Sequence, residues 1–260
     1  MAVRPITSNP YTTLIEFTPG YDGTWRPLKV ILSFLSTLHN FTKENLFQKS
    51  IRSYLKPYGH GKYPGTSLKC RWEDRIDKQN WCHVSRRKLI DWTHDVHCSR
   101  SENFGFALAQ PCIVLKPTKL FDWEPEPYYN ITEVQQLPDM PKRLKNEISK
   151  TWEKHCKGQD EKTESKCPRL RMVWVSCAGE TLVDTEYMGP VHLTPMNGFP
   201  GKYFPYVNQN HYLSPLISIQ FRNLTPGVLV SVVCKLWAKN IRHDPQNPFI
   251  GGTRFELRMN

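Results

Sequence analysis

The chain has 260 residues, of which 39% are apolar and 23% are charged, a balance typical of globular proteins rather than disordered ones. Its 35 basic and 24 acidic residues give a net charge of +11, but the basic residues are scattered along the chain. The sequence shows neither a basic helix nor an aromatic-basic RNA-binding motif, so it predicts no nucleic-acid partner. It also shows no run approaching the ~20 apolar residues that a membrane-spanning helix needs.

The first 40 residues are predicted to hold one strand and one helix. Residues 1–24 are rich in Pro, Thr and Gly and are expected to be extended, with a strand over Tyr11–Phe17. A helix is expected over Trp25–Leu38, because Pro27 lies near its start, where a missing N–H is tolerated, and because apolar residues recur at helical spacing. These apolar residues are Leu28, Ile31, Leu35 and Leu38.

The middle of the chain is rich in cysteines and turn residues. Residues 69–112 contain four cysteines with three tryptophans between them, which indicates a loop-rich region held by disulfides. A strand is predicted over Ile113–Lys116 and a helix over Arg143–His155. The charged segment 158–166 is expected to be a solvated loop.

From Arg171 onward the pattern is that of β-strands. Alternating apolar residues over 173–177 and 228–236 place Cys177 and Cys234 on the apolar faces of two strands. If these strands face each other across a sandwich, the two sulfur atoms meet in the core, as in the inter-sheet bridge of immunoglobulin-like domains. A half-buried strand is predicted over 216–222 and a final strand over Thr253–Arg258.

These elements predict a mainly β fold. We expect an immunoglobulin-like antiparallel β-sandwich with an N-terminal helix and disulfide-stapled loops. Residues 25–260 are expected to form a single domain with loop elaborations, and residues 1–24 an extended segment before it.

The eight cysteines and three N-glycosylation sequons indicate an oxidising, lumenal or extracellular compartment. The sequons begin at Asn40, Asn130 and Asn223, and Pro226 directly after the third disfavours its use. The opening residues are not followed by the apolar segment of a signal peptide. The sequence thus combines secretory chemistry with no visible means of reaching the secretory pathway.

Motifs for catalysis or metal binding are weak. The run His94-Asp95-Val96-His97-Cys98 offers several possible metal ligands, but they are crowded, and structural zinc sites show paired ligands in two separated clusters. The hydrolase motif GxSxG, the metalloprotease motif HExxH and the phosphate-loop motif GxxxxGK[ST] do not occur. We therefore predict no catalytic residues, no metal site and no cofactor.

An aromatic loop is the clearest candidate for binding. Tyr203, Phe204 and Tyr206 surround Pro205, and protein interfaces favour such rings. The same rings are equally consistent with a loop that packs on the edge of its own sandwich, and the residues alone leave both interpretations open.

Several C-terminal segments resemble the beta subunit of the sodium/potassium-transporting ATPase. The run GFPGKYFPYVNQNHYLSPLISIQFRNLTPG at 198–227 is similar to the family's aromatic stretch, its YLxPL element and its QFxNLT strand. The segments GFALAQPCIVL at 105–115, VSCAG at 175–179 and VVCKLWAKNI at 232–241 resemble further family segments. The resemblance is specific over residues 98–260 and looser before them.

The resemblance implies a set of disulfides. In the family pattern the bridges correspond to Cys70–Cys82, Cys98–Cys112 and Cys177–Cys234. Cys156 and Cys167 have no counterpart in the vertebrate-like pattern, and their proximity suggests an added fourth bridge around a variable surface loop.

The resemblance also implies a location. Members are type II membrane glycoproteins of the plasma membrane, in which a transmembrane helix precedes an extracellular immunoglobulin-like domain. Residues 1–24 then correspond to a juxtamembrane-like segment and 25–260 to the ectodomain. We expect the missing anchor to reflect an incomplete start of the sequence rather than a protein without one.

The function implied by the resemblance is non-catalytic. The family's beta subunit assists the folding and surface delivery of the catalytic alpha subunit and tunes its potassium affinity. The residues that match the family's aromatic stretch, expected near the extracellular loops of the alpha subunit, are Tyr203, Phe204, Pro205 and Tyr206. The alternative is a secreted or cell-surface adhesion module of the same fold without a pump partner.

Overall fold

The structure is a computed structural model of the 260-residue chain. It describes residues 15–18, 29–32, 51–53, 55–59, 67–68, 70–72, 74, 81–84, 98–99, 102–117, 119–157 and 167–259.

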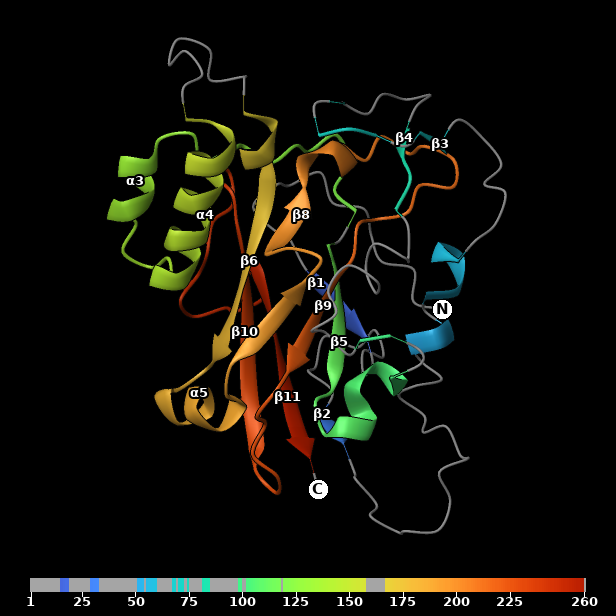
Figure 1. Ribbon diagram of the computed structural model, residues 1–260, viewed down its shortest axis with the longest axis vertical. Coiled ribbons are helices and arrows are strands. Elements are labelled where there is room, and N and C mark those ends of the chain that lie inside the picture. Colours follow the sequence, from blue (N-terminus) through green and yellow to red (C-terminus); the bar gives the residue numbers. More distant parts are fainter. Residues whose placement is uncertain are drawn as a thin grey trace.

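Two β-sheets form the body of the described chain (Figure 1). The four-stranded sheet has the order β1-β5-β9-β7, with bounds Ile15–Thr18, Cys112–Pro117, Ile217–Phe221 and Val191–Thr194. The five-stranded sheet has the order β2-β11-β10-β6-β8, with bounds Lys29–Leu32, Gly252–Met259, Leu229–Trp237, Met172–Gly179 and Gly198–Pro200. Within these two sheets only β2 and β11 pair in parallel. A short parallel pair, β3 (Ser67–Leu68) and β4 (Trp81–Cys82), stands apart.

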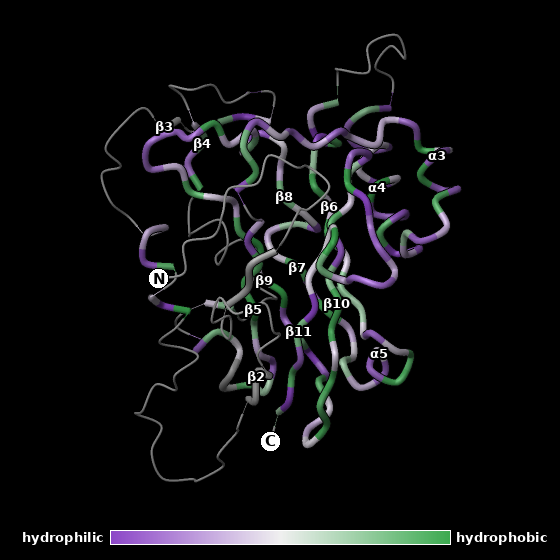
Figure 2. Tube along the Cα trace, turned by 180° about the vertical axis from the view of Figure 1, so that it is seen from behind, coloured by the Kyte–Doolittle hydropathy of each residue, from purple (hydrophilic) through white to green (hydrophobic). Residues whose placement is uncertain are grey.

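The inner core lies between the two sheets. Phe221 of β9 and Phe255 of β11 are fully buried, and their rings meet edge to face with centroids 6.3 Å apart. Figure 2 shows the hydrophobic colour concentrated along the central strands. The predicted mainly β sandwich is therefore confirmed.

A second core lies on the outer face of the five-stranded sheet. Helices α3 (Ile131–Gln136) and α4 (Lys142–His155) lie beside β6 in Figure 1. Leu144 and Ile148 of α4 pack in one cluster with residues of β6 and β10. Those strand residues are Met172, Trp174 and Trp237. Because alternate residues of β6 face opposite cores, its first half, Met172–Val175, is apolar on both faces instead of alternating between apolar and polar.

The remaining described helices are short. Helix α5 (Leu182–Met188) connects β6 to β7 and begins with a capping box between Thr181 and Asp184. The 3₁₀ turns are η1 (Lys56–Tyr58), η2 (Asn103–Leu108), η4 (Pro168–Leu170) and η5 (Gly201–Tyr203).

Most predicted elements are present. The strands predicted over Ile113–Lys116 and Thr253–Arg258 and the helix predicted over Arg143–His155 correspond to β5, β11 and α4. The strand predicted over Tyr11–Phe17 overlaps β1 at residues 15–17. The predicted loop 158–166 lies outside the described residues.

The helix predicted over Trp25–Leu38 is wrong at Lys29–Leu32, which form strand β2. This segment pairs in parallel with β11, with Lys29 opposite Glu256 and Leu32 opposite Met259. Val30 and Ile31 are β-branched and suit a strand, so the pairing with β11 overrides the helical spacing. The other residues of the predicted helix lie outside the described part of the chain.

Strand β9 is buried on both faces rather than half-buried as predicted. Ser218 is 4% exposed and Gln220 is fully buried. The Nε2 of Gln220 donates a hydrogen bond to Oε1 of Gln110 at 3.2 Å. This bond satisfies a polar group that the alternating pattern assigns to solvent.

The eight cysteines form four disulfides. They join Cys70–Cys82, Cys98–Cys112, Cys156–Cys167 and Cys177–Cys234. The predicted position of the last bridge, between two sheets, is wrong. Cys177 and Cys234 lie opposite each other on the neighbouring strands β6 and β10 of one sheet, with Cα atoms 4.1 Å apart.

Candidate functional site

The aromatic loop follows β8 and the turn η5 at the end of the five-stranded sheet. Its rings point into the protein: Tyr203, Phe204 and Tyr206 are only 8%, 7% and 7% exposed. Pro205 is also buried, and the Phe204–Pro205 peptide bond is cis. We define the aromatic loop as residues 203–206.

Hydrogen bonds to main-chain oxygens fix the path of the aromatic loop. The hydroxyl of Tyr212 donates to the carbonyl oxygen of Tyr203 at 2.7 Å. The Nε2 of Gln209 donates to the carbonyl oxygen of Pro205 at 3.1 Å, and the main-chain N–H of Asp122 donates to that of Tyr206 at 2.9 Å. These bonds satisfy carbonyl groups that irregular backbone would otherwise leave unpaired in the interior.

The rings of the aromatic loop also pack against aromatic and basic side chains outside the loop. Trp123 meets Phe204 edge to face at 5.6 Å between centroids, and Tyr206 lies 5.1 Å from Tyr212. The Nζ of Lys119 lies 5.0 Å from the ring centroid of Tyr206. Such aromatic pairs add to the stability that burial alone provides.

A buried lysine joins the aromatic loop to the loop closed by Cys70–Cys82. Lys202 is 8% exposed, and its Nζ donates a hydrogen bond to the carbonyl oxygen of Cys70 at 2.9 Å. The same Nζ lies 5.5 Å from the ring centroids of both Trp72 and Tyr203. The guanidinium carbon of Arg169 also lies 4.2 Å from the centroid of the Trp72 ring. Cation–π contacts thus bind the stapled loop to the sandwich.

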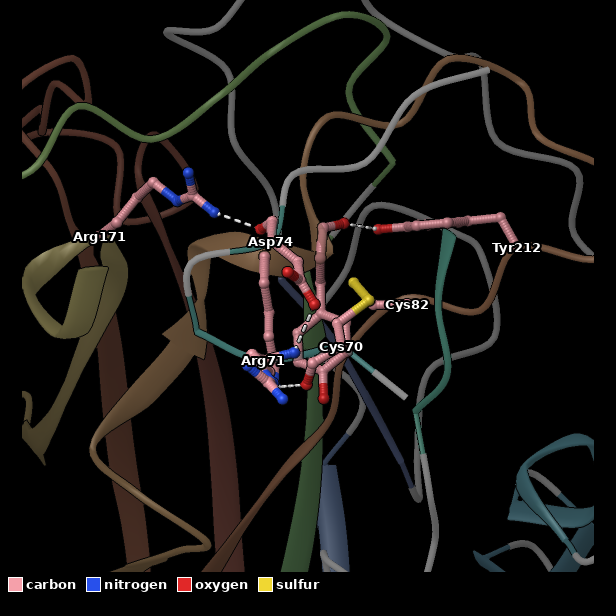
Figure 3. Close-up of a disulfide and its surroundings, with 8 residues drawn as sticks. Cys70, Arg71, Asp74, Cys82, Arg171 and Tyr212 are labelled. Atoms are coloured by element: carbon pink, nitrogen blue, oxygen red, sulfur yellow. Dashed lines mark hydrogen bonds between the residues drawn. A yellow bond between two sulfur atoms is a disulfide. The ribbon is translucent and has the colours of Figure 1, made fainter. Parts of the chain in front are cut away.

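Figure 3 shows the surroundings of the Cys70–Cys82 disulfide. The main-chain N–H of Arg71 donates to Oδ2 of Asp74 at 2.6 Å, which folds the loop back on itself. The Nη2 of Arg171, which precedes β6, donates to the carbonyl oxygen of Asp74 at 2.7 Å. Arg171, directly before β6, and Lys202, directly before the aromatic loop, therefore both bond to described residues of the Cys70–Cys82 loop, although they lie far from it in sequence.

Burial shifts the pKa values of Tyr203 and Tyr212. It raises the pKa of Tyr203 to about 12, and it also raises the pKa of Tyr212 well above the usual range. Both phenols are therefore neutral at physiological pH and act as hydrogen-bonding and packing groups.

The aromatic loop was open to two interpretations, a binding surface or a loop packed on its own sandwich, and its buried rings match the second.

Sequence reasoning missed Phe121, which is 44% exposed beside the loop and forms an isolated β-bridge with the buried Tyr206. It also missed the exposed apolar start of α5, where Leu182 and Val183 are 90% and 58% exposed. The capping box before them, Thr181 to Asp184, could have located this helix in the sequence.

Two of the three sequon asparagines lie in the described chain, and both are exposed. Asn130 is the N-cap of α3, and its Oδ1 accepts a hydrogen bond from the N–H of Glu133 at 3.2 Å. Its Nδ2, the atom to which a sugar is joined, is not used by this cap. Asn223 lies two residues after the end of β9, and Asn40 lies outside the described residues.

The described residues contain no group of three His, Cys, Asp or Glu side chains that could hold a metal ion. Cys98 is joined to Cys112, while His94 to His97 lie outside the described residues. Among the described helices, none combines the length and apolar character needed to cross a membrane.

Comparison with known proteins gives a consistent result. The family model described as the sodium/potassium ATPase beta chain matches residues 3–255. The sodium/potassium-transporting ATPase subunit beta-2 of Drosophila melanogaster is 38% identical over 258 residues, covering 94% of this chain and 72% of the relative. Subunit beta-1 of the same organism is 39% identical over 194 residues, covering 74% of this chain and 54% of the relative. Human subunit beta-2 is 38% identical over 91 residues, covering 33% of this chain and 31% of the relative.

Proposed function

Because this chain belongs to the sodium/potassium ATPase beta chain family, we propose that it is the non-catalytic beta subunit of a sodium/potassium-transporting P-type ATPase. The observation that carries the proposal is the family match over residues 3–255. In this role the alpha subunit hydrolyses ATP and moves the ions. This chain assists the folding and surface delivery of the alpha subunit and tunes its potassium affinity.

The proposed location is the extracellular side of the plasma membrane. Four disulfides support an oxidising compartment. Exposed asparagines in two sequons support passage through the compartments where sugars are attached.

We propose that the contact with the alpha subunit lies at the surface around the aromatic loop, because the rings of the loop itself are buried. Because the rings of Tyr203, Phe204 and Tyr206 fill this chain's own core, they support the contact by fixing the shape of the surface around them. Phe121 is the exposed aromatic side chain of that surface.

Co-expression with a sodium/potassium ATPase alpha subunit tests the proposal. We expect the alpha subunit to co-purify with this chain and to reach the cell surface in larger amounts when the chain is present. A Phe121→Ser variant should reduce co-purification, while Leu182→Ser, on an exposed apolar residue of α5, should not. The measurements are affinity capture and surface biotinylation of the alpha subunit.

The adhesion module predicts a different outcome. In that case the chain is exported equally well with and without the alpha subunit, and affinity capture from the cell surface brings down another surface protein. This result would contradict the pump assignment.

A further inference from the structure

The sandwich has an open edge where β6 approaches β7. β7 is the last strand of the four-stranded sheet, and no described strand pairs with its outer side. β8 pairs with β6 only over Met172–Trp174, and the N–H of Val175 then donates to the carbonyl oxygen of Asn197 at 2.9 Å. Beyond Val175, no described strand pairs with the outer side of β6.

The register shows which main-chain groups of β7 face outward. The N–H of Phe221 donates to the carbonyl oxygen of Pro111, so the main chain of Phe221 faces β5 rather than β7. Val191 lies opposite Phe221, and Leu193 lies two positions further along β7. In an antiparallel ladder the hydrogen-bonding direction alternates, so the N–H and C=O groups of Val191 and Leu193 point to the open edge. Such unpaired groups form a template for another strand.

A cavity of about 140 Å³ lies along this open edge. Its walls include Val175 and Ala178 of β6, Val191 and Leu193 of β7, and Leu144 of α4. The lining is mostly apolar. An apolar cavity of about 150 Å³ can hold benzene, so this one has room for a single aliphatic or aromatic side chain.

The rim of the cavity has a basic side. The first turn of α4 carries Lys142 and Arg143, both exposed, and no acidic residue. Arg143 lines the cavity and forms no ion pair with another described residue. Glu147 on the same rim already forms an ion pair, because its Oε1 lies 3.4 Å from the Nζ of Lys150. A carboxylate is the complementary group for this side of the rim.

We propose that the edge groove, formed by the outer side of β7, residues 175–178 of β6 and the first turn of α4, binds an extended peptide segment of a partner protein. The segment adds a strand to β7 through the main chain of Val191 and Leu193. One apolar side chain of the segment fills the cavity. An acidic side chain two positions away, on the same face of the added strand, faces Arg143. This mode of recognition takes its affinity from main-chain hydrogen bonds and its specificity from the pocket.

The probe is a fluorescein-labelled peptide, Thr-Val-Thr-Leu-Thr-Glu-Thr, titrated by fluorescence anisotropy into the purified, disulfide-bonded chain. We expect saturable binding and slower deuterium exchange in the fragment that contains Val191–Thr194. A Gly-Ser peptide of the same length should bind at least tenfold more weakly.

Three variants test the three parts of the groove. Ala178→Trp fills the cavity from an exposed position of β6, and Leu193→Pro removes an outward N–H without removing a ladder hydrogen bond to β9. Each should weaken binding of the peptide at least tenfold. Arg143→Glu should weaken binding at least fivefold. The matched control is Lys154→Glu, at an exposed position of the same helix that does not line the cavity, and it should change binding less than twofold.

Wild-type protein that binds both peptides equally would overturn the proposal, and so would an Ala178→Trp variant that binds like the wild type. Concentration-dependent dimerisation that protects β7 without peptide would assign the groove to a second copy of this chain instead. Circular dichroism of each variant verifies that its fold is retained. The outcome is independent of alpha-subunit capture, so the two proposals can fail separately.

Discussion

At the scale of single residues, the aromatic loop owes its shape to contacts with distant parts of the chain. Lys202 hydrogen-bonds to Cys70, which lies 132 positions away, and Phe204 packs against Trp123. These partners explain why the sequence left two interpretations of Tyr203, Phe204 and Tyr206 open. A local run of rings does not reveal whether its partners belong to the same chain or to another protein.

A double variant, Tyr203→Ala with Phe204→Ala, separates the two interpretations. Because both rings are buried, we expect a large loss of stability, since replacing a buried aromatic residue with alanine costs about 3–5 kcal/mol per site. A loss of this size approaches the whole stability of an ordinary domain. Thermal unfolding followed by circular dichroism measures it.

The matched control is Tyr187→Ala on α5, where the ring is 38% exposed. It should change stability by less than about 1 kcal/mol. A double variant that melts like the wild type but no longer captures an alpha subunit would instead make the rings a direct contact.

Alkaline pH should destabilise the protein through the same tyrosines. Burial raises the pKa of Tyr203 from 10.0 in its unperturbed state to about 12. Folding therefore favours the neutral phenol, and its contribution is fully present below pH 10 and is lost as the pH rises through the folded-state pKa. We expect Tyr203→Phe to unfold less steeply with pH above 10 than the wild type, as followed by tyrosinate absorbance. Ionisation of Tyr203 near its ordinary pKa in the folded protein would contradict its burial.

At the scale of elements, the in-phase apolar positions predict which residues of β6 and β10 face inward, but not how the strands are arranged. Cys177 and Cys234 share a face whether the two strands are neighbours or face each other across a sandwich. Only the pairing register shows that they are neighbours. The segment Lys29–Leu32 shows the same limit, because its partner β11 lies at the other end of the chain and local helical spacing carries no information about it.

The Cys177–Cys234 bridge should be required for export. Cys234 is fully buried, so Cys234→Ser opens the bridge, places a hydroxyl in the core and leaves Cys177 as a free thiol. Closing a loop of this length contributes about 4 kcal/mol in the chain-entropy model. We expect the variant to be retained in the endoplasmic reticulum, as measured by the secreted or surface fraction.

The control for this experiment removes the disulfide that closes the shortest loop in the sequence. A double variant, Cys156→Ser with Cys167→Ser, opens a bridge of sequence separation 11 at the end of α4 and leaves no free thiol from that pair. It should be exported with a lowered melting temperature. Normal export of Cys234→Ser would contradict the role given to the paired strands.

At the scale of the whole molecule, β6 connects the two cores. Its residues Val173 and Val175 pack in the inner core, whereas Met172 and Trp174 pack under α4 in the outer core. The sequence predicts both the strand and helix α4 as elements, but it assigns only one apolar face to the strand. The sequence could not place the helix on the strand, because that contact depends on how the chain returns over the sheet.

Sharing β6 leads to the prediction that residues 25–260 unfold as one domain. Ile148 of α4 is fully buried in the outer core, and Ile148→Ala should cost about 2–5 kcal/mol. Because loosening α4 also exposes one face of β6, we expect the loss to lower the stability of both cores together. Urea unfolding followed by far-ultraviolet and near-ultraviolet circular dichroism should then give coincident transitions, each shifted by the same amount. Two separated transitions, with only the first moved by Ile148→Ala, would instead make the helical layer an independent folding unit.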